Sequence, residues 1–388
     1  MATPFSHLEC SVPCGAGPYD VKHAHHRCTC GAPLLARYDL TSAKRTQRSD
    51  LNPQDASLWR FREVLPLLES DKGIDAAVTL GEGGTPLVRA RRLGKSLGIE
   101  RLFIKDESAN PTQAIEARDM ATAVTRAFHL GTRAMSFGGN ARAAAALAAY
   151  ATRVGLESRL TLPKDSDKHL VDVCGLFGAA ISLVDGLSTD AASASIHQSQ
   201  TDQSFDVSDF NEPYRLEGRK TICYELAEEL GWQMPDWIVA PTGSGMTVVG
   251  LWKAFSELGA LGWIDPVRKP HIVVVQAAGC APLVRAYASG SDKAVPWQDT
   301  RSAAADLRVP STPADGLVLR AIRESDGAAI SVGDAETTAA AKEVTRTEGV
   351  GASLACGAAL HAVRVLLGEG RLKAKDTVVI LNPGSVIG

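Results

Sequence analysis

The sequence predicts an α/β fold in which helices connect the strands of parallel sheets. The alternation of its apolar stretches and the length of each stretch carry this prediction. Short apolar stretches of strand length alternate with longer stretches in which apolar residues recur every three or four positions. Strands that alternate with helices of about 10–15 residues join as parallel neighbours through helical crossovers. The length of 388 residues predicts two or three domains and allows a large core.

The elements of the first half follow in order. Residues 1–40 are rich in Cys and His and short of helix signals, and a polar stretch then leads to a helix expected at 56–70. From about residue 101 the alternation is regular. Strands are expected at 101–105, 133–137, 158–162 and 179–184, with helices at 114–130 and 141–154 and a third between the last two strands.

A second alternating block fills the rest of the chain. It starts with a helix expected at 216–230, and its first strand runs into a glycine-rich turn. Strands are expected at 237–240, 271–277, 328–332 and 377–381, with helices at 246–258 and 315–323 and two more before the last strand.

Composition excludes several classes of protein. Hydrophobic residues are 45% and charged residues 22%, which excludes a disordered, collagen-like or coiled-coil chain. A net charge of −3 gives no basic field for nucleic acid or an anionic membrane. The longest apolar runs, such as 143–150, fall short of the ~20 residues that span a bilayer. Because MATPFSHLEC also lacks the pattern of a signal peptide, we expect a cytoplasmic protein.

The strongest local signal is PTGSGMT at 241–247, between an expected strand and an expected helix. Glycines let backbone amides approach an anion, and the helix N-terminus adds partial positive charge. The alternative is a tight turn without a ligand. The loop is neither a Walker A motif nor a full dinucleotide fingerprint. Its candidate ligand-binding residues are Gly243, Ser244, Gly245, Met246 and Thr247.

A second turn of this kind is SFGGN at 136–140. Asn140 either caps the following helix or aims its amide at a ligand. Turns at the carboxyl ends of parallel strands form ligand crevices, so two of them predict a shared cleft. We assign Gly138, Gly139 and Arg142 to the substrate side of this cleft.

Taken in order, the motifs resemble threonine synthase and its relatives. The resemblance rests on GGN, on PTGSG and on four longer stretches: LGEGGTPLV (80–88), IKDESANPT (104–112), EPYRLEGRKTICYELAEELGW (212–232) and LWKAF (251–255). That family uses pyridoxal 5′-phosphate on the fold type II scaffold, the architecture of the tryptophan synthase β subunit. The resemblance implies that the glycine loop cradles the cofactor phosphate, that Asn140 contacts the ring hydroxyl and that Ser385 faces the pyridine nitrogen.

The resemblance also implies a domain arrangement. A Cys-rich knuckle is expected at 1–40, a large α/β domain at 41–117 and 219–388, and a smaller α/β domain inserted at 118–218. We expect the ligand cleft between the two α/β domains, where ligand sites are common. Since relatives are often dimers, a homodimer is expected.

One departure from the family pattern concerns its chemistry. After Asn-Pro-Thr the family continues Gly-Ser-Phe-Lys-Asp-Arg-Gly, and that lysine forms the Schiff base. This chain reads Gln-Ala-Ile-Glu-Ala-Arg-Asp at 113–119, so Glu116 stands where the resemblance implies the lysine. A carboxylate cannot form an imine, so no covalent cofactor is expected there. The neighbouring residues have changed as well, which favours natural divergence over an engineered single substitution, and Arg142 and Cys356 are two further departures that fit it.

We expect Glu116 to act as a general acid or base, with Arg118 or Arg142 nearby to stabilise the developing anion. Burial raises the pKa of a carboxyl group, whereas a nearby arginine lowers it and stabilises a developing anion. This predicts a cofactor-independent, lyase-type reaction (elimination, isomerisation or condensation) on a small phosphorylated or carboxylated, amino-acid-like metabolite. Alternatives are an enzyme with non-covalent pyridoxal phosphate and a non-catalytic binding or regulatory protein, in which Glu116 merely pairs with Arg118. Ordinary threonine synthase activity is not expected.

The N-terminal cysteines form a candidate metal site. Four thiolates can hold tetrahedral zinc in a closed, structural site. The spacing, C-x3-C followed by C-x-C, is irregular, so a knuckle folded without metal is the alternative. The four scattered cysteines are expected in the core. The expected zinc ligands are Cys10, Cys14, Cys28 and Cys30.

Overall fold

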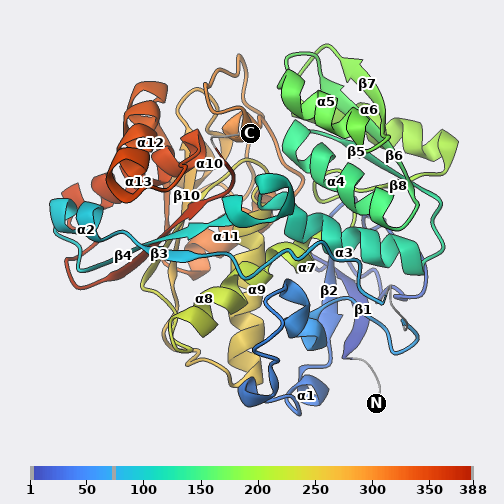
Figure 1. Cartoon of the computed structure of the whole chain (residues 1–388), viewed down its shortest axis with the longest axis horizontal. Coiled ribbons are helices and arrows are strands. Elements are labelled where there is room, and N and C mark those ends of the chain that lie inside the picture. Colours follow the sequence, from blue (N-terminus) through green and yellow to red (C-terminus); the bar gives the residue numbers. More distant parts are fainter. Residues whose placement is uncertain (1–3, 72–75, 386–388) are drawn as a thin grey trace.

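The computed structural model of the chain describes residues 4–71 and 76–385, which form three sheets and the helices around them (Figure 1). The α/β fold class is confirmed. In Figure 1 the six-stranded sheet lies to the left and the four-stranded sheet to the upper right. A two-stranded sheet near the N-terminus packs below the four-stranded one.

The largest sheet has six strands in the order β11-β10-β9-β12-β4-β3. Its neighbours are parallel except at one edge, where β3 pairs with β4 in the antiparallel sense. The strands are β3 (Leu87–Arg89), β4 (Arg101–Asp106), β9 (Trp237–Pro241), β10 (His271–Ala277), β11 (Ala328–Val332) and β12 (Thr377–Asn382).

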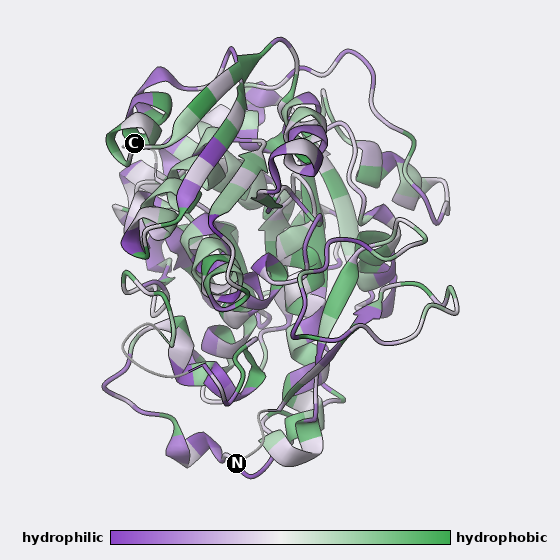
Figure 2. Ribbon diagram, turned by 90° about the vertical axis from the view of Figure 1, so that its right-hand side faces the viewer, coloured by the Kyte–Doolittle hydropathy of each residue, from purple (hydrophilic) through white to green (hydrophobic). Residues whose placement is uncertain are grey.

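Helices cover both faces of this sheet because side chains alternate between the faces along each strand. In β9, Ile238 and Ala240 pack in one core cluster with α8, α9 and α11, whereas Val239 packs in another with α2, α12 and α13. Figure 2 shows hydrophobic strand segments enclosed by helices in the interior. The helices are α2 (Arg91–Leu97), α8 (Thr221–Glu229), α9 (Met246–Leu261), α10 (Pro282–Ala288), α11 (Asp315–Glu324), α12 (Asp334–Glu348) and α13 (Leu354–Gly368).

The second sheet has four parallel strands in the order β7-β6-β5-β8. The alanine-rich helix α4 is almost wholly buried, since its small side chains allow close packing against α3 and the sheet. The elements are α3 (Glu116–His129), β5 (Ala134–Gly138), α4 (Ala141–Arg153), β6 (Glu157–Pro163), α5 (Lys168–Leu176), β7 (Ala180–Val184), α6 (Ser188–Asp202) and β8 (Phe205–Asp206).

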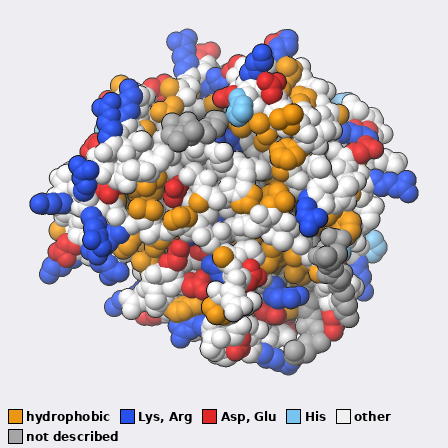
Figure 3. Space-filling view, in the orientation of Figure 1, with side chains coloured by type: hydrophobic (Ala, Val, Ile, Leu, Met, Phe, Trp, Pro, Cys, Tyr) orange, Lys and Arg blue, Asp and Glu red, His pale blue; other side chains and the backbone are white. Residues whose placement is uncertain are grey.

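The third sheet is the antiparallel pair β1 (Phe5–Cys10) and β2 (Leu34–Tyr38). The chain also forms two short helices, α1 (Leu40–Ala43) and α7 (Arg215–Arg219). Among the described residues, none of the helices combines the length and hydrophobicity needed to cross a bilayer. Acidic, basic and hydrophobic side chains are interspersed over the face in Figure 3.

Most expected elements are confirmed within one to three residues, and two expectations are wrong. Residues 56–70 form no α-helix but only the 3-10 segment Leu58–Val64, because Phe61 is non-helical and Pro66 follows. The helix expected at 216–230 is broken into α7 and α8 at Lys220. Each of the three sheets takes all its strands from one of the expected domains. The expected domain boundaries at 117/118 and 218/219 fall inside α3 and α7, and they stay predictions.

Candidate active site

Three adjoining cavities lie where the N-termini of α3, α4 and α9 approach one another. The first, of about 80 Å³, is lined by Glu116, Arg142 and the loop 241–247, and is called the glycine-loop cavity below. A second, of about 280 Å³, is the Ser385 cavity. The third, of about 410 Å³, is the Arg27 cavity. Asn140 and Asp306 line all three, so the two glycine turns do border one cleft.

The glycine loop connects the end of β9 to the start of α9. Gly245 has a φ of 92°, and a Cβ added there would lie 2.2 Å from Val318. A Cβ on Gly243 would lie 2.5 Å from the carbonyl oxygen of Asp306, so both positions require glycine. The backbone N–H groups of residues 243–247 find no protein acceptor within the described chain. They are therefore available to an anion at the N-terminus of a 16-residue helix.

Glu116 is the first residue of α3 and lines the glycine-loop cavity. Its Oε2 atom is buried and has no hydrogen-bond partner among the described residues. Burial raises the pKa of this carboxyl group to about 7; Arg219 opposes the rise, and Asp306 and Asp119 add to it. A carboxyl group with this pKa can both accept and release a proton near neutral pH.

A buried ion-pair chain runs from α3 to the start of α9. Asp119 accepts hydrogen bonds from Arg219 Nε at 2.6 Å and from Arg215 Nη2 at 3.3 Å. Arg219 Nη1 also donates to Thr247 Oγ1 at 2.8 Å. A fixed guanidinium group therefore adds positive charge beside the glycine loop.

Sequence reasoning did not identify Asp119, Arg215 or Arg219 as part of the site. Arg219 lies in the helix expected at 216–230 and Arg215 immediately precedes it; their spacing of four places both on one face if the helix begins one residue earlier. Asp119 follows Glu116 by three residues, so it shares the face of α3 that meets them. These spacings were the available signal.

Arg142 reaches across the cleft from the first turn of α4. Its Nη2 atom donates to the carbonyl oxygen of Ser385 at 3.0 Å, and its Nε atom lies 3.5 Å from Asp306 Oδ2. Its side chain is 18% exposed, so the charge is partly open to the cleft. Ser385 itself lines the Ser385 cavity and not the glycine-loop cavity.

Arg118 does not lie in the cleft, which corrects its expected place beside Glu116. Its fully buried guanidinium group donates to Glu107 at 2.6 Å and to Glu225 at 2.7 Å. Burial opposes ionisation of Glu225, but Arg118 and Lys105 outweigh it and hold the pKa of that carboxyl group well below its usual range. Two residues turn an α-helix by about 200°, so Arg118 points away from the cavity that Glu116 lines.

The SFGGN turn serves both the helix and the cleft. Asn140 Oδ1 accepts a hydrogen bond from Ala143 N at 2.9 Å, which is an N-cap of α4. Gly138 and Gly139 line the Arg27 cavity rather than the glycine-loop cavity. They therefore line a different part of the cleft from Glu116.

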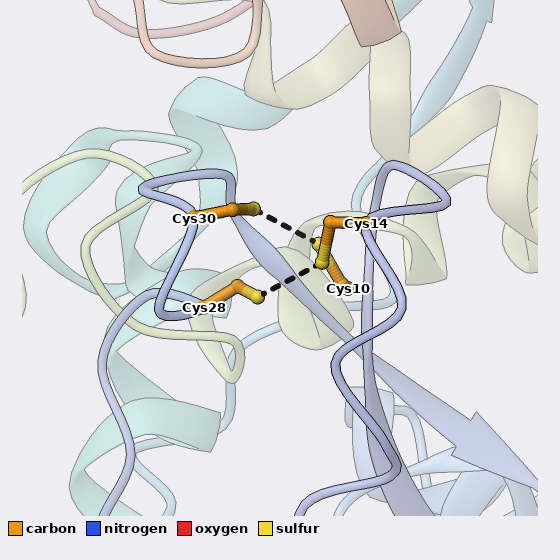
Figure 4. Close-up of side chains that lie close together, drawn as sticks. All are labelled: Cys10, Cys14, Cys28 and Cys30. Carbon is orange, nitrogen blue, oxygen red and sulfur yellow. Dashed lines mark hydrogen bonds between the residues drawn. The ribbon is translucent and has the colours of Figure 1, made fainter.

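The four N-terminal cysteines are brought together, as Figure 4 shows. Their sulfur atoms all lie within 4.8 Å of one another. Cys10 and Cys28 are buried, and Cys14 and Cys30 are exposed. The four scattered cysteines are all buried, as expected.

The sequence model of one family, described as pyridoxal-phosphate dependent enzyme, matches residues 78–384. The chain belongs to this family. Among curated relatives, the threonine synthase of Methanocaldococcus jannaschii is 32% identical over 380 residues, which cover 97% of this chain and 92% of the relative. That of Methanosarcina acetivorans is 32% identical over 383 residues, with 98% and 92% covered.

Solved structures of other enzymes share the fold of this chain. An L-serine ammonia-lyase from Rhizomucor miehei aligns with a TM-score of 0.67 and 20% identity over 80% of this chain and 95% of that one. Maize serine racemase aligns with a TM-score of 0.66 and 19% identity over 78% and 88%. The expected fold type II architecture is thereby confirmed.

The positions of the lysines matter because the sequence resemblance implies a lysine that forms a Schiff base with the cofactor. None lines any of the three cavities within the described residues. Lys105 is fully buried and pairs with Glu225 at 2.9 Å and Glu229 at 2.8 Å. Lys220 and Lys253, also buried, share the carboxylates of Glu217 and Glu257. These amines are held in ion pairs away from the cleft.

Proposed function

We propose that the chain is a divergent, threonine synthase-like enzyme in which Glu116 stands in the position of the Schiff-base lysine. It catalyses a cofactor-independent, lyase-type reaction on a small phosphorylated or carboxylated, amino-acid-like metabolite. One observation carries the proposal: within the described residues, Glu116 Oε2 is buried without a partner in the same cavity as the unpaired N–H groups of the glycine loop. An acid or base and an anion site therefore share one enclosed space.

The cleft fits only one part of pyridoxal phosphate. The glycine loop suits the phosphate group, but the three cavities offer no lysine amine to anchor the aldehyde. In addition, Arg142 is hydrogen-bonded to Ser385, the residue that the resemblance assigns to the pyridine nitrogen. The cofactor therefore does not fit as a covalently bound group, and no step of the reaction runs through it.

The residues of the cleft support a division of roles. The loop amides and Arg219 bind the phosphate or a carboxylate of the substrate. Glu116 Oε2 takes a proton from the carbon next to a carboxylate, and the electron pair of the broken C–H bond forms a new double bond as the leaving group departs. Arg142 stabilises the negative charge that develops. The proton on Oε2 then passes to the leaving group, which restores the carboxylate.

A second candidate is an enzyme that holds pyridoxal phosphate without a covalent bond. The glycine loop favours it, because its shape and free amides are those expected of a cofactor phosphate site. The same 32% identity to threonine synthases also supports retention of the cofactor. In this case the loop amides would hold the cofactor phosphate, the cofactor would supply an aldehyde for the substrate amine, and Glu116 would carry the protons.

The first experiment is an absorbance spectrum of the full chain, followed by titration with pyridoxal phosphate, borohydride reduction and mass spectrometry. A colourless protein with no saturable binding and no added mass supports the cofactor-independent reaction. A covalent adduct overturns it, because another lysine then performs the ordinary chemistry. Saturable binding without an adduct overturns it in favour of the second candidate.

Turnover is then screened with small phosphorylated and carboxylated amino acids. Glu116→Gln is compared with Glu100→Gln, which changes an exposed carboxylate outside the cleft. Loss of turnover in the first variant alone supports the role of Glu116. Binding without turnover across the screen overturns the enzymatic reading in favour of a metabolite-binding protein.

A further inference from the structure

The four-cysteine cluster has the dimensions of a metal site. Cys10 Sγ lies 3.5 Å from Cys30 Sγ, and Cys14 Sγ lies 3.5 Å from Cys28 Sγ. A tetrahedral zinc site with Zn–S bonds of about 2.3 Å has edges of about 3.8 Å. A disulfide would instead bring two sulfur atoms to about 2.05 Å, and all four cysteines are free. Four thiols thus converge on one point without pairing.

The backbone holds Cys10 and Cys14, which form one pair along the chain, opposite the second pair, Cys28 and Cys30. Cys10 ends β1, and Cys14 follows in a turn closed by its own N–H to Val12 O at 2.8 Å. Before β2, Gly31 N donates to Cys28 O at 2.8 Å, which closes the turn that carries Cys28 and Cys30. Both pairs lie at the same end of the β1–β2 sheet, where β1 ends and β2 begins, and Figure 4 shows them opposite each other.

The cluster also has an outer contact of the kind that metal ligands receive. Tyr19 OH donates a hydrogen bond to Cys28 Sγ at 3.2 Å. Tyr19 in turn pairs with Leu8 of β1 through two backbone hydrogen bonds, of 2.8 and 3.0 Å. Hydrogen bonds to a ligand atom orient it and tune the bound metal.

The segment between the two cysteine pairs leads directly to the cleft. Arg126 of α3 donates to Val21 O at 3.0 Å, which fixes the segment against that helix. His26 stacks on Phe205 with ring centroids 4.9 Å apart. The next residue, Arg27, lines the Arg27 cavity together with Asn140 and Ser244. Its Nε atom is buried and has no partner among the described residues.

We propose that Cys10, Cys14, Cys28 and Cys30 bind one zinc ion, and that this ion holds the segment 15–27 so that Arg27 faces the substrate cleft. A closed set of four thiolates suits zinc in a structural role. Arg27 then recognises a second anionic group of the substrate, since its Nε donor is unused by any residue that the structure describes. The metal site is independent of the proposed function, whereas the role of Arg27 rests on it.

The first test is the metal content of the full chain, produced without a histidine tag in zinc-replete medium and measured by plasma mass spectrometry. We expect about one zinc per chain, lost in Cys14→Ser/Cys30→Ser and kept in the control Cys174→Ala, which changes a buried cysteine of α5. Zinc well below one per chain in the wild type, or zinc retained by the double variant, overturns the site. Iron in place of zinc overturns the identity of the metal.

A measurement on the wild type tests the structural role of the metal even if the double variant fails to fold. We expect a chelator to raise amide hydrogen exchange in residues 11–33 and to leave α9 unchanged, because the ion closes only the N-terminal segment. Unchanged exchange after complete zinc removal overturns the structural role.

Arg27 is tested by binding of two probes, inorganic phosphate and O-phosphoserine, which adds a carboxylate. We expect Arg27→Met to weaken O-phosphoserine by about tenfold or more and to leave inorganic phosphate unchanged. Lys22→Met removes an exposed cation from the same segment and should change neither. Equal binding of O-phosphoserine by wild type and Arg27→Met overturns the role of Arg27. No phosphate binding by the wild type instead contradicts the anion site of the proposed function.

Discussion

Glu116 and Asp119 lie one turn apart at the start of α3, and the guanidinium group of Arg219 donates to Asp119 but not to Glu116. The cation is therefore used by one carboxylate, while Oε2 of the other is buried and finds no partner in the part of the chain that the structure describes. This difference explains why burial dominates at Glu116 and raises its pKa to about 7.

Removal of the Glu116 carboxyl group should make the protein more stable at high pH. Its pKa is about 7 in the folded chain against a usual value of 4.5, so the folded state binds more protons between these values. Stability then falls as pH rises from 4.5 to 7, by about 3 kcal/mol in total. We expect Glu116→Gln to gain up to about 3 kcal/mol over the wild type at pH 8 and little at pH 4.5, measured by urea unfolding. An equal effect at both pH values would contradict the raised pKa.

The same pKa should appear in the rate of reaction. If Glu116 acts as a base, turnover of the substrate found by the screen rises with pH through about 7, where the carboxyl group ionises. Glu116→Gln should lose about 10²- to 10⁴-fold in rate and the pH dependence with it. A variant that keeps the same pH profile at lower rate would assign the titration to another group.

Arg118 should matter for folding rather than for turnover. Its removal leaves Glu107 buried without its main cation and weakens the hold on Glu225. Breaking a buried ion pair on one side costs about 3–5 kcal/mol, so we expect Arg118→Met to be destabilised by that amount in urea unfolding. The exposed Arg153→Met, also on a helix, should change by less than about 0.5 kcal/mol. Wild-type stability with lost turnover would return Arg118 to the catalytic site.

Much of the fold could be predicted from the sequence because its signals are local. The apolar period of β9, β10 and β12 and of the helices between them lies within short windows. The pair β1–β2 was not predicted, since it depends on pairing across more than twenty residues of loop. The break between α7 and α8 was missed because Gly218 lies inside α7 and no proline marks the break at Lys220.

The site was predictable to the same extent. Glu116, Asn140 and the glycine loop stand in recognisable motifs, and the structure brings them to one cleft. Arg219 was missed because its partner Asp119 lies 100 residues away in the sequence. The misplacement of Arg118 was avoidable, since helix geometry alone turns it away from Glu116.

Substitution of the loop glycines should remove anion binding. An alanine at Gly245 adopts a left-handed conformation at φ 92° and overlaps Val318, so the loop must move. We expect Gly245→Ala to lose measurable binding of inorganic phosphate in calorimetry. Gly175→Ala is the control, because its Cβ meets nothing within 4 Å and the helical site favours alanine by about 0.5–1 kcal/mol. Phosphate binding by Gly245→Ala equal to the wild type would place the anion site elsewhere.

A lysine at position 116 should restore a covalent cofactor only when Arg142 is also removed. Glu116→Lys supplies an amine in the glycine-loop cavity, but Arg142 still holds Ser385 and occupies the space beside it. We expect Glu116→Lys/Arg142→Ala to form a borohydride-stable adduct with pyridoxal phosphate, found at position 116 by peptide mapping, and Glu116→Lys alone to form much less.

The matched control for this pair is Glu116→Gln/Arg142→Ala, which opens the same space without an amine. An adduct in that control would show that a lysine outside the cleft reacts, and the position of Glu116 would then have no bearing on the cofactor. An adduct of equal yield in both lysine variants would show that Arg142 does not obstruct the ring. Because the single and double variants share the amine and differ only in the Arg142–Ser385 contact, their ratio measures how far that contact excludes the cofactor.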